Sequence, residues 1–397
     1  MPPRILHVDL DAFFVEVCRQ RHPELRGIEC LVVGGRRDQR GVVQSASYPA
    51  RVFGIRAGMP IARAAKLCPQ ATFFQGSFSH YQEASRAVRE VLQRHSPVVV
   101  MASLDEAYLD FTGTERLHPV SLLPCAERIR DEVKAETGLD CSIGIGPNRM
   151  IAKLASDAAK PRGLMEVRPG WEEGFLAWLP LKALPGIGPK TAEAWATKGL
   201  TEVWQIQRME LEALRTLVGP AATELKARAH GHGGTTLTAD RRPKSIGRET
   251  TLSSDATTEQ PLDRLLARFA AKVASELRHE GLQARTVTLK LRHGDFHTVT
   301  RRRTLDRPTD LDGELLAAAR ALFPPAWAEA RARHQGVRLI GLSASGLVPA
   351  APGELFEPEE RVRLRQVTQA VDRVRERFGF ESLTVAHLAR PAGKKSR

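Results

Sequence analysis

The stretch SLDEAYLD, residues 103–110, places two adjacent carboxylates, Asp105 and Glu106, between two apolar segments. It follows the β-branched run at residues 97–101 and continues into the apolar residues 107–111. Two short strand patterns that meet at a polar turn predict a hairpin. Adjacent carboxylates repel each other unless a proton or a cation lies between them. For an isolated Asp-Glu pair, a solvated hairpin tip is the simpler interpretation.

A second acidic pair, Asp9 and Asp11, stands at the end of an apolar strand predicted at residues 4–9. An Asp-x-Asp triplet alone is weak evidence in a chain this charged. Its position matters more, because ligands collect at the carboxyl ends of strands in open sheets. Oxygen ligands from two strand ends are typical of Mg²⁺ sites in which phosphates supply the remaining ligands. Phe13 and Phe14 follow directly and cannot both point the same way.

Composition and charge limit the classes of protein. The length of 397 residues predicts several domains, and 42% hydrophobic with 26% charged residues is typical of a soluble globular protein. We find no apolar run long enough to cross a bilayer and no signal peptide. The net charge of +13 suggests a polyanionic partner. The five scattered cysteines lack zinc spacing and predict reduced thiols in a cytoplasmic protein.

The first part of the chain is predicted to fold as βαββαβ, the split ferredoxin-like arrangement, with a small lobe inserted. The elements in order are a strand at residues 4–9, a helix from Phe13, the lobe at about 22–76, a helix at 77–95, the hairpin, a helix at about 120–137 and a strand at 141–146. In this order the first strand and the hairpin strands can lie side by side. Asp9 and the pair Asp105 and Glu106 then converge although they are far apart in sequence.

The inserted lobe contains a helical turn predicted at residues 47–54. Tyr48 and Arg51 are three positions apart and share a face of that turn. An arginine there suits contact with a phosphate, although a solvent-facing arginine is an equally good interpretation of these residues alone.

The helix predicted at residues 148–160 is amphipathic and ends at Pro161. Its pattern predicts Ile151, Leu154 and Ala158 inward and Lys153, Asp157 and Lys160 outward. Lys160 at the helix end is favourable to the helix dipole, which is a purely structural role.

The run LPGIGPKTA, residues 184–192, lies in an all-helical segment at about 169–233 and is a helix-hairpin-helix signature. Gly186 and Gly188 allow a tight turn, and backbone N–H groups at the start of the next helix, near Lys190, face a phosphate. The GHGG run at residues 231–234 and the polar residues after it, to Asp240, are predicted to form a flexible linker.

Residues 241–347 again have the order βαββαβ. The segment 241–303 holds 14 Lys and Arg against 7 Asp and Glu, a pattern that suits a sheet laid along a nucleic-acid backbone. The candidates for DNA contact are Lys244, Ser245, Arg248, Arg301 and Arg303. A linker at 350–358, a charged helix at 359–377 and a basic end follow.

Six segments in this order resemble the Y family of DNA polymerases, of the DNA polymerase IV type. They are HVDLDAFF (7–14), SYPARVFGI (47–55), SLDEAYLD (103–110), SIGIGPNRMIAKLASDAAKPRG (142–163), LPGIGPKTA (184–192) and KSIGRETT (244–251). The resemblance covers roughly residues 4–347 and implies an α+β right-hand polymerase. Its parts would be a ferredoxin-like palm at 1–22 and 77–166, fingers at 23–76, a helical thumb at 167–233, a linker at 234–243, a βαββαβ little finger at 244–347 and a tail at 348–397.

The resemblance also implies roles for single residues. Asp9, Asp105 and Glu106 would hold two Mg²⁺ ions, with the Leu10 carbonyl as a further ligand, for the two-metal displacement scheme. Asp11 matches an acid that is not usually a metal ligand. The positions implied to contact the nucleotide are Phe13, Phe14, Ser45, Tyr48, Arg51 and Lys160.

Two positions bear on selectivity. Phe14 matches the steric gate, whose ring lies where a ribose 2′-hydroxyl would go. Gln44 stands where smaller residues are often found, which leaves open the size of the roof over the nascent base pair.

The expected function is therefore low-fidelity translesion DNA synthesis in damage tolerance, by a cytoplasmic, nucleoid-associated monomer without membrane contact. Its expected partners are primer-template DNA, dNTPs and a sliding clamp, the last through Leu355 and Phe356, although the glutamine of the usual clamp peptide is absent. A nucleotidyl cyclase shares the palm arrangement, but the helix-hairpin-helix and the basic sheet argue against it. An inactive adaptor of a mutasome-like complex is the other alternative, and the three carboxylates argue against it.

Overall fold

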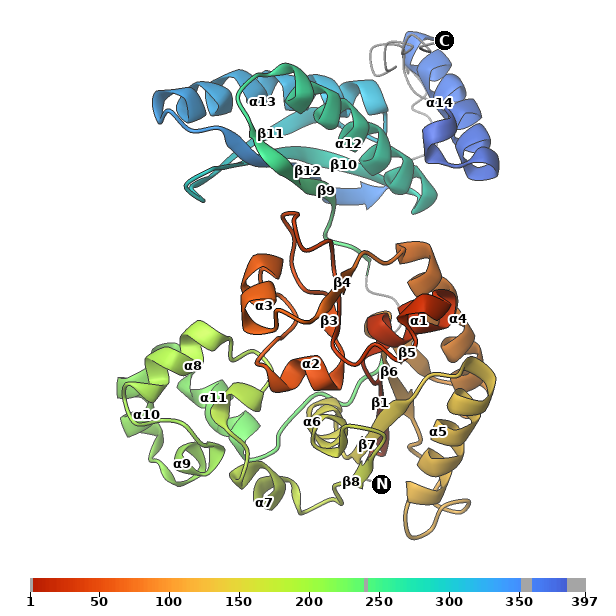
Figure 1. Ribbon diagram of the computed structural model, residues 1–397, viewed down its shortest axis with the longest axis vertical. Helices are drawn as coiled ribbons and strands as arrows, with labels where there is room; N and C mark the ends of the chain where they lie inside the picture. Colours follow the sequence, from red (N-terminus) through yellow and green to blue (C-terminus); the bar gives the residue numbers. More distant parts are fainter. Residues whose placement is uncertain (1–2, 239–241, 351–358, 384–397) are drawn as a thin grey trace. The chain divides into compact units, whose positions relative to one another are not determined.

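A five-stranded sheet carries both acidic segments of the chain. The structure is a computed structural model that describes residues 3–238, 242–350 and 359–383 (Figure 1). It divides into two units, Met1–Arg241 and Arg242–Arg397, and the division falls in the linker predicted at 234–243. No helix in these ranges is both long and apolar enough to span a bilayer.

The sheet of the first unit has the strand order β5-β6-β1-β7-β8. The central strand β1 (Ile5–Leu10) pairs antiparallel with β6 (Glu106–Asp110) and with β7 (Cys141–Gly146). The hairpin predicted around Asp105 is confirmed, because β5 (Val99–Met101) pairs antiparallel with β6. The ferredoxin-like arrangement is confirmed too. The edge strand β8 (Leu164–Glu166), which pairs parallel with β7, was not predicted.

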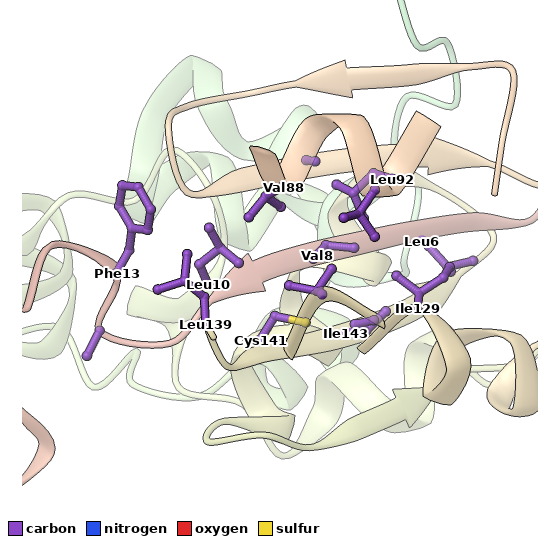
Figure 2. Close-up of a cluster of buried hydrophobic side chains, with 14 of the residues drawn as sticks. Leu6, Val8, Leu10, Phe13, Val88, Leu92, Ile129, Leu139, Cys141 and Ile143 are labelled. Atoms are coloured by element: carbon purple, nitrogen blue, oxygen red, sulfur yellow. The ribbon is translucent and has the colours of Figure 1, made fainter. Parts of the chain in front are cut away.

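Helices cover the two faces of this sheet unequally. On one face lie α4 (Phe78–Gln93) and α5 (Leu123–Thr137), and the core there joins Leu6, Val8 and Leu10 of β1 to apolar residues of both helices (Figure 2). Side chains alternate along a strand, so the odd-numbered residues of β1 point to the opposite face. That face is covered by α6 (Arg149–Ala159), and it carries Asp9.

Glycine lets α6 approach the sheet closely. A Cβ atom added to Gly144 of β7 would overlap the carbonyl oxygen of Ala152 and the amide nitrogen of Ser156, both on α6. The absence of a side chain at this position therefore brings the polar residues of α6 against the strand ends.

We expect Gly144→Ala to destabilise the protein by about 3 kcal/mol or more, because backbone atoms of α6 must move to admit the methyl group. Gly174→Ala is the matched control, since nothing lies within 4 Å of the added Cβ. Chemical unfolding of both variants checks the expectation. Equal stability of the Gly144→Ala variant and the parent protein would contradict the close packing.

The inserted lobe is a small separate layer with its own core. Its sheet has the order β3-β2-β4, with β2 (Leu31–Val33) between β3 (Ser45–Ala46) and β4 (Thr72–Phe74). The strand β4 was not predicted. Two short helices complete the lobe. The helix α2 (Tyr48–Val52) lies within the helical turn predicted at 47–54, and α3 (Ile61–Leu67) lies where the sequence pattern predicts a second helix, at 60–68.

A helical subdomain follows, as predicted, and its core includes Ile151 and Leu154 of α6. Its helices are α7 (Glu172–Ala177), α8 (Pro189–Ala196), α9 (Val203–Arg208), α10 (Leu211–Val218) and α11 (Ala222–Ala229). The segment after α11 returns to α6, because the amide of Asn148 donates to the Gly231 carbonyl at 2.8 Å and the Arg149 N–H donates to the Gly234 carbonyl at 3.1 Å. The start of the predicted flexible linker is thus bonded to the body of the unit.

The second unit has the predicted element order βαββαβ but a different strand order, β11-β10-β12-β9. The strands are β9 (Ser245–Ala256), β10 (Leu282–His293), β11 (Thr298–Thr309) and β12 (Val337–Pro349), and the helices are α12 (Gln260–His279) and α13 (Asp312–Ala332). In the first unit the second strand of the hairpin, β6, lies beside the first strand of the chain. Here the first strand of the hairpin, β10, is central instead. The two βαββαβ units are therefore not copies of one topology.

The last part of the second unit differs from the prediction at one helix end. The sequence pattern predicts a helix at residues 311–323, but α13 continues through Pro324 and Pro325, and Trp327 packs in the core beyond them. The charged helix α14 (Glu359–Phe378) is present and binds the unit through ion pairs, among them Arg278 with Asp372 at 2.6 Å. Leu355 and Phe356, the residues of the clamp prediction, lie outside the described residues.

Candidate active site

The acidic segments meet at one end of the first sheet. Asp9 of β1 is the direct register partner of Glu106 of β6. The N–H of Leu10 donates to the Asp105 carbonyl at 2.9 Å. Ser103 holds the turn, because its hydroxyl donates to Asp105 Oδ1 at 2.6 Å and accepts from the Glu106 N–H at 3.1 Å. The strand ends and the turn that carry the three carboxylates thus lie side by side, as predicted.

These residues line one cavity of ≈ 580 Å³. All ten positions predicted for metal or nucleotide contact line it: Asp9, Leu10, Phe13, Phe14, Ser45, Tyr48, Arg51, Asp105, Glu106 and Lys160. The further lining residues are Ala12, Gln44, Ala46, Arg56 and Ala57. The prediction missed Arg56, a cation directly after the segment SYPARVFGI. That closeness in sequence was the available signal.

Lys153 of α6 and Lys160, the residue that directly follows this helix, bind the carboxylates. The Lys160 ammonium donates to Asp9 Oδ2 at 2.7 Å and to Asp157 Oδ1 at 2.9 Å. The Lys153 ammonium donates to Glu106 Oε1 at 2.6 Å. The prediction that Lys153 and Lys160 point outward was wrong, because this face of α6 lies on the sheet and not in solvent.

The prediction of which residues form the inward face of α6 was also partly wrong. Ala158 is exposed, and Ala155 packs with Ile151 and Leu154 instead. The reason is that α6 lies between two bodies, the strand ends on one side and the helical subdomain on another. A single apolar stripe does not describe such a helix.

The electrostatics of Asp9 and Glu106 differ. Burial raises the pKa of Asp9 to about 6, against the opposing attraction of Lys160. The imidazole of His7, whose Nε2 lies 3.6 Å from Glu106 Oε2, and the Lys153 ammonium lower the pKa of Glu106 to about 2. The ionised Asp9 is poorly solvated, so it gains most from a nearby cation.

The donor set fits a hard divalent cation in its chemistry. Asp9, Asp105 and Glu106 offer carboxylate oxygens to one cavity, and oxygen ligands of this kind suit Mg²⁺ rather than a thiophilic metal. As the side chains stand, no three His, Cys, Asp or Glu residues in the described part of the chain are close enough together to hold a metal. Lys160 and Lys153 supply the positive charge at Asp9 and Glu106 in this arrangement.

An aromatic cluster positions Phe14. Phe13 is buried, and its ring centroid lies 5.2 Å from that of Phe14. The Tyr81 ring packs edge-on against Phe14 at 4.8 Å, and the Tyr81 hydroxyl lies 3.2 Å from the Cys18 sulfur. The Phe14 ring is thereby held at the wall of the cavity.

The lobe contributes Tyr48 and Arg51 from α2. The prediction that they share a face is confirmed, since the Arg51 guanidinium carbon lies 4.7 Å from the Tyr48 ring centroid. The Tyr48 hydroxyl donates to Asp11 Oδ1 at 2.7 Å. Asp11 also accepts from the Ser142 hydroxyl and from the Arg162 N–H, at 3.0 and 2.8 Å. Asp11 thus braces the lobe against the sheet and does not line the cavity.

The predicted DNA contacts of the first unit lie at the start of α8. Gly186 has a positive φ of 91°, which favours glycine. Gly188 is the N-cap residue of α8, and Lys190 is exposed within its first turn. Their contact with DNA stays a prediction.

Strand register separates the basic residues of the second unit into two sets. Arg301 and Arg303 are the register partners of the buried Leu289 and Val287, so they point to the helix-covered face. There Arg301 pairs with Glu329 of α13 at 2.7 Å, and Arg248 of β9 pairs with Glu276 of α12.

The open face of the same sheet carries other cations. Lys290, Arg292 and Arg302 lie on it, with Ser245 at the start of β9. Lys244 precedes that strand. The sequence pattern identified a basic sheet but did not distinguish its faces, and all these DNA contacts stay predictions.

Comparison with known proteins shows which family has this sequence and this site. The model of the impB/mucB/samB family matches residues 8–157, and the model of that family's C-terminal domain matches residues 243–355. DNA polymerase IV of Caulobacter vibrioides is 38% identical over 377 residues, covering 94% of this chain and 91% of that protein. DNA polymerase IV of Halorhodospira halophila is 40% identical over 346 residues, covering 87% and 96%. The chain belongs to the Y family of DNA polymerases.

Solved structures agree with this assignment. A Y-family DNA polymerase chimera of Dbh and Dpo4 has a TM-score of 0.74 with 25% identity and covers 87% of this chain and 99% of its own. DinB from Sulfolobus solfataricus has a TM-score of 0.57 with 24% identity, covers 86% of this chain, and supports the fold alone. The chain is of the DNA polymerase IV type, a DNA-directed DNA polymerase, and the resemblance read from its motifs is confirmed.

Proposed function

We propose that this protein adds deoxynucleotides to the 3′ end of a DNA primer by a two-metal mechanism. One observation carries the proposal: Asp9 and Glu106 are direct register partners and line one cavity with Asp105 and with every predicted nucleotide contact. Asp9, Asp105, Glu106 and the Leu10 carbonyl would hold two Mg²⁺ ions. Bound cations there would supply the positive charge that activates a hydroxyl and stabilises a triphosphate.

The cavity also supplies cations for the triphosphate. Both Arg51 and Lys160 line the cavity. Arg51 belongs to the inserted lobe, and Lys160 follows the end of α6. An arginine guanidinium suits a phosphate because it donates in a fixed fork, and a lysine acts as a point charge. Lys160, once released from Asp9, can bind a phosphate oxygen. The Tyr48 hydroxyl has a single proton, which Asp11 accepts here, so a Tyr48–phosphate contact requires that bond to open.

The rest of the proposal concerns substrates and partners. Primer-template DNA and dNTPs are the substrates, and synthesis past damaged template bases is the proposed role. Gln44 lines the cavity and would bear on which template bases fit. We further propose a monomer that binds a sliding clamp through Leu355 and Phe356. Inactive adaptors typically lack metal carboxylates, whereas all three are present here, which argues against that alternative.

Primer extension on undamaged and damaged templates tests the proposal. We expect extension with Mg²⁺ and none after chelation, because the carboxylates alone cannot stabilise the charge that develops in phosphoryl transfer. Restoring Mg²⁺ to the chelated sample controls for irreversible damage. Extension that persists without any divalent cation would contradict the two-metal mechanism, and binding of DNA without extension would favour the adaptor.

A further inference from the structure

Three tryptophans of the helical subdomain expose their side chains to solvent. Trp171 is 71% exposed, Trp178 is 87% exposed and Trp204 is 43% exposed. Apolar residues that are exposed singly are ordinary on a protein surface, whereas exposed apolar residues that lie together mark an interaction site. The elements that carry the three tryptophans therefore decide what their exposure means.

Trp171 and Trp178 flank one short helix. They are the N-cap and C-cap residues of α7. Residues seven apart on a helix share a face and lie about 10 Å apart along its axis. Phe175, four residues after Trp171 and three before Trp178, belongs to the same face and packs partly into the core of the subdomain. This face of α7 is therefore aromatic along its whole length and exposed at both ends.

A backbone bridge brings Trp204 to the same surface. The helices α7 and α9 lie side by side (Figure 1), and the chain after α7 pairs with the chain before α9 in an antiparallel bridge. The Val203 N–H donates to the Leu179 carbonyl at 3.0 Å. Leu179 and Val203 pack in the core, and each is next in the chain to one of the exposed tryptophans, Trp178 and Trp204. We call Trp171, Trp178 and Trp204 the aromatic patch.

Two cations beside the aromatic patch are not used by the fold. Arg208 is exposed, and its guanidinium carbon lies 5.6 Å from the centroid of the Trp204 ring. Lys182 is exposed four residues after Trp178. Neither cation makes an ion pair within the part of the chain that the structure describes. An aromatic surface next to unpaired positive charge suits a partner that offers apolar side chains and carboxylates.

Two carboxylates of α7 disfavour a nucleic acid as that partner. Glu172 and Glu173 stand between Trp171 and Trp178 in the chain, and both have partners within the subdomain. A single strand of nucleic acid carries a charge at every phosphate and is bound by cations along its whole path. A peptide can instead place its acids at the two unpaired cations and its apolar side chains along α7.

We propose that the aromatic patch, together with Lys182 and Arg208, binds an acidic segment of another protein that carries aromatic or large aliphatic side chains. Tryptophan and arginine are enriched among the residues that supply most of the binding energy of protein interfaces. None of these five residues lines the catalytic cavity, so the surface can hold a partner while that cavity is in use. The proposal does not depend on the proposed polymerase function.

The test is a selection of short random peptides, displayed on phage, on the full chain and in parallel on Trp178→Ala. We expect the parent protein to enrich peptides that combine acids with aromatic or large aliphatic side chains. The most enriched peptide is then synthesised, and its Kd is measured by fluorescence anisotropy. Trp178→Ala and Trp171→Ala should each raise the Kd about tenfold or more. Arg208→Glu should raise it by about the same at low salt and by less at high salt, because salt screens exposed charges.

The controls separate the aromatic patch from general exposure of rings. Phe78→Ala removes a ring of α4 that is 60% exposed and should leave the Kd unchanged. Trp178→Phe keeps an aromatic ring and should keep most of the affinity. Thermal unfolding of Trp178→Ala should match that of the parent protein, since the side chain removed is almost wholly in solvent.

Four results would overturn the proposal. The first is that no peptide is enriched, and the second is that enriched peptides lack acids or bind Trp178→Ala as well as the parent protein. The third is binding of a single-stranded thymidine oligonucleotide that Trp178→Ala loses, which would assign the aromatic patch to DNA. The fourth is a dimer in sedimentation experiments that Trp178→Ala abolishes, which would assign it to a second copy of the chain.

Discussion

Glu106→Ala and Asp105→Ala are each expected to lower the rate of primer extension by about 10³-fold or more. The expected loss corresponds to about 4 kcal/mol of transition-state stabilisation, the scale of removing a preorganised charge from a phosphoryl-transfer site. Both side chains line the cavity with Asp9, and Glu106 also binds the Lys153 ammonium. The measurement is single-turnover extension at saturating DNA and dNTP. DNA affinity should change little, because neither residue is predicted to contact the duplex.

Two controls accompany this prediction. Asp131→Ala removes an exposed carboxylate of α5 and should leave the extension rate unchanged. Glu106→Gln keeps the size of the side chain, so a loss in that variant comes from the charge and not from a cavity. Because Glu106→Ala leaves the half-buried Lys153 without its carboxylate, thermal unfolding should confirm that the variant is folded. Extension within about threefold of the parent in both Glu106 variants would remove Glu106 from the metal set.

Phe14→Ala is expected to reduce discrimination against ribonucleotides by about 10²-fold. The Phe14 ring is held at the wall of the catalytic cavity by Phe13 and Tyr81, so it cannot yield easily to an extra hydroxyl. A rigid wall rejects the larger substrate by overlap, and its removal admits it. The measurement is the ratio of kcat/KM for a dNTP to that for the matching rNTP. The rate with the dNTP should fall much less than the ratio.

The matched control is Phe78→Ala, at the exposed start of α4, which should leave the ratio unchanged. Phe13→Ala is a poor control, because Phe13 is buried in the core and its loss costs about 3 kcal/mol or more. An unchanged sugar ratio in a folded Phe14→Ala variant would show that another residue excludes the ribose hydroxyl.

The local sequence pattern was sufficient to predict much of the fold of the first unit. The β-branched run before SLDEAYLD and the alternating residues after it form the predicted hairpin, and Asp9 meets Glu106 across the register. Period-two alternation and the βαββαβ order constrain a sheet strongly, because a shift by one residue would bury charge. The three-residue strands β4 and β8 were missed.

Tertiary packing decided which way the side chains of α6 and its end point. The helix pattern placed Lys153 and Lys160 on the outward face, whereas they bind Glu106 and Asp9, because α6 packs against two bodies at once and Gly144 admits it to the sheet.

In the second unit the composition predicted a basic sheet, and only the register showed that Arg301 lies on the helix-covered face and Arg302 on the open one. By itself the sequence determined the elements, their order and the acidic residues that meet at the strand ends. Tertiary structure decided strand order, the partners of each cation and the aromatic patch. A residue's neighbours along the chain set its local conformation, whereas the surface it faces is formed by segments far away in sequence.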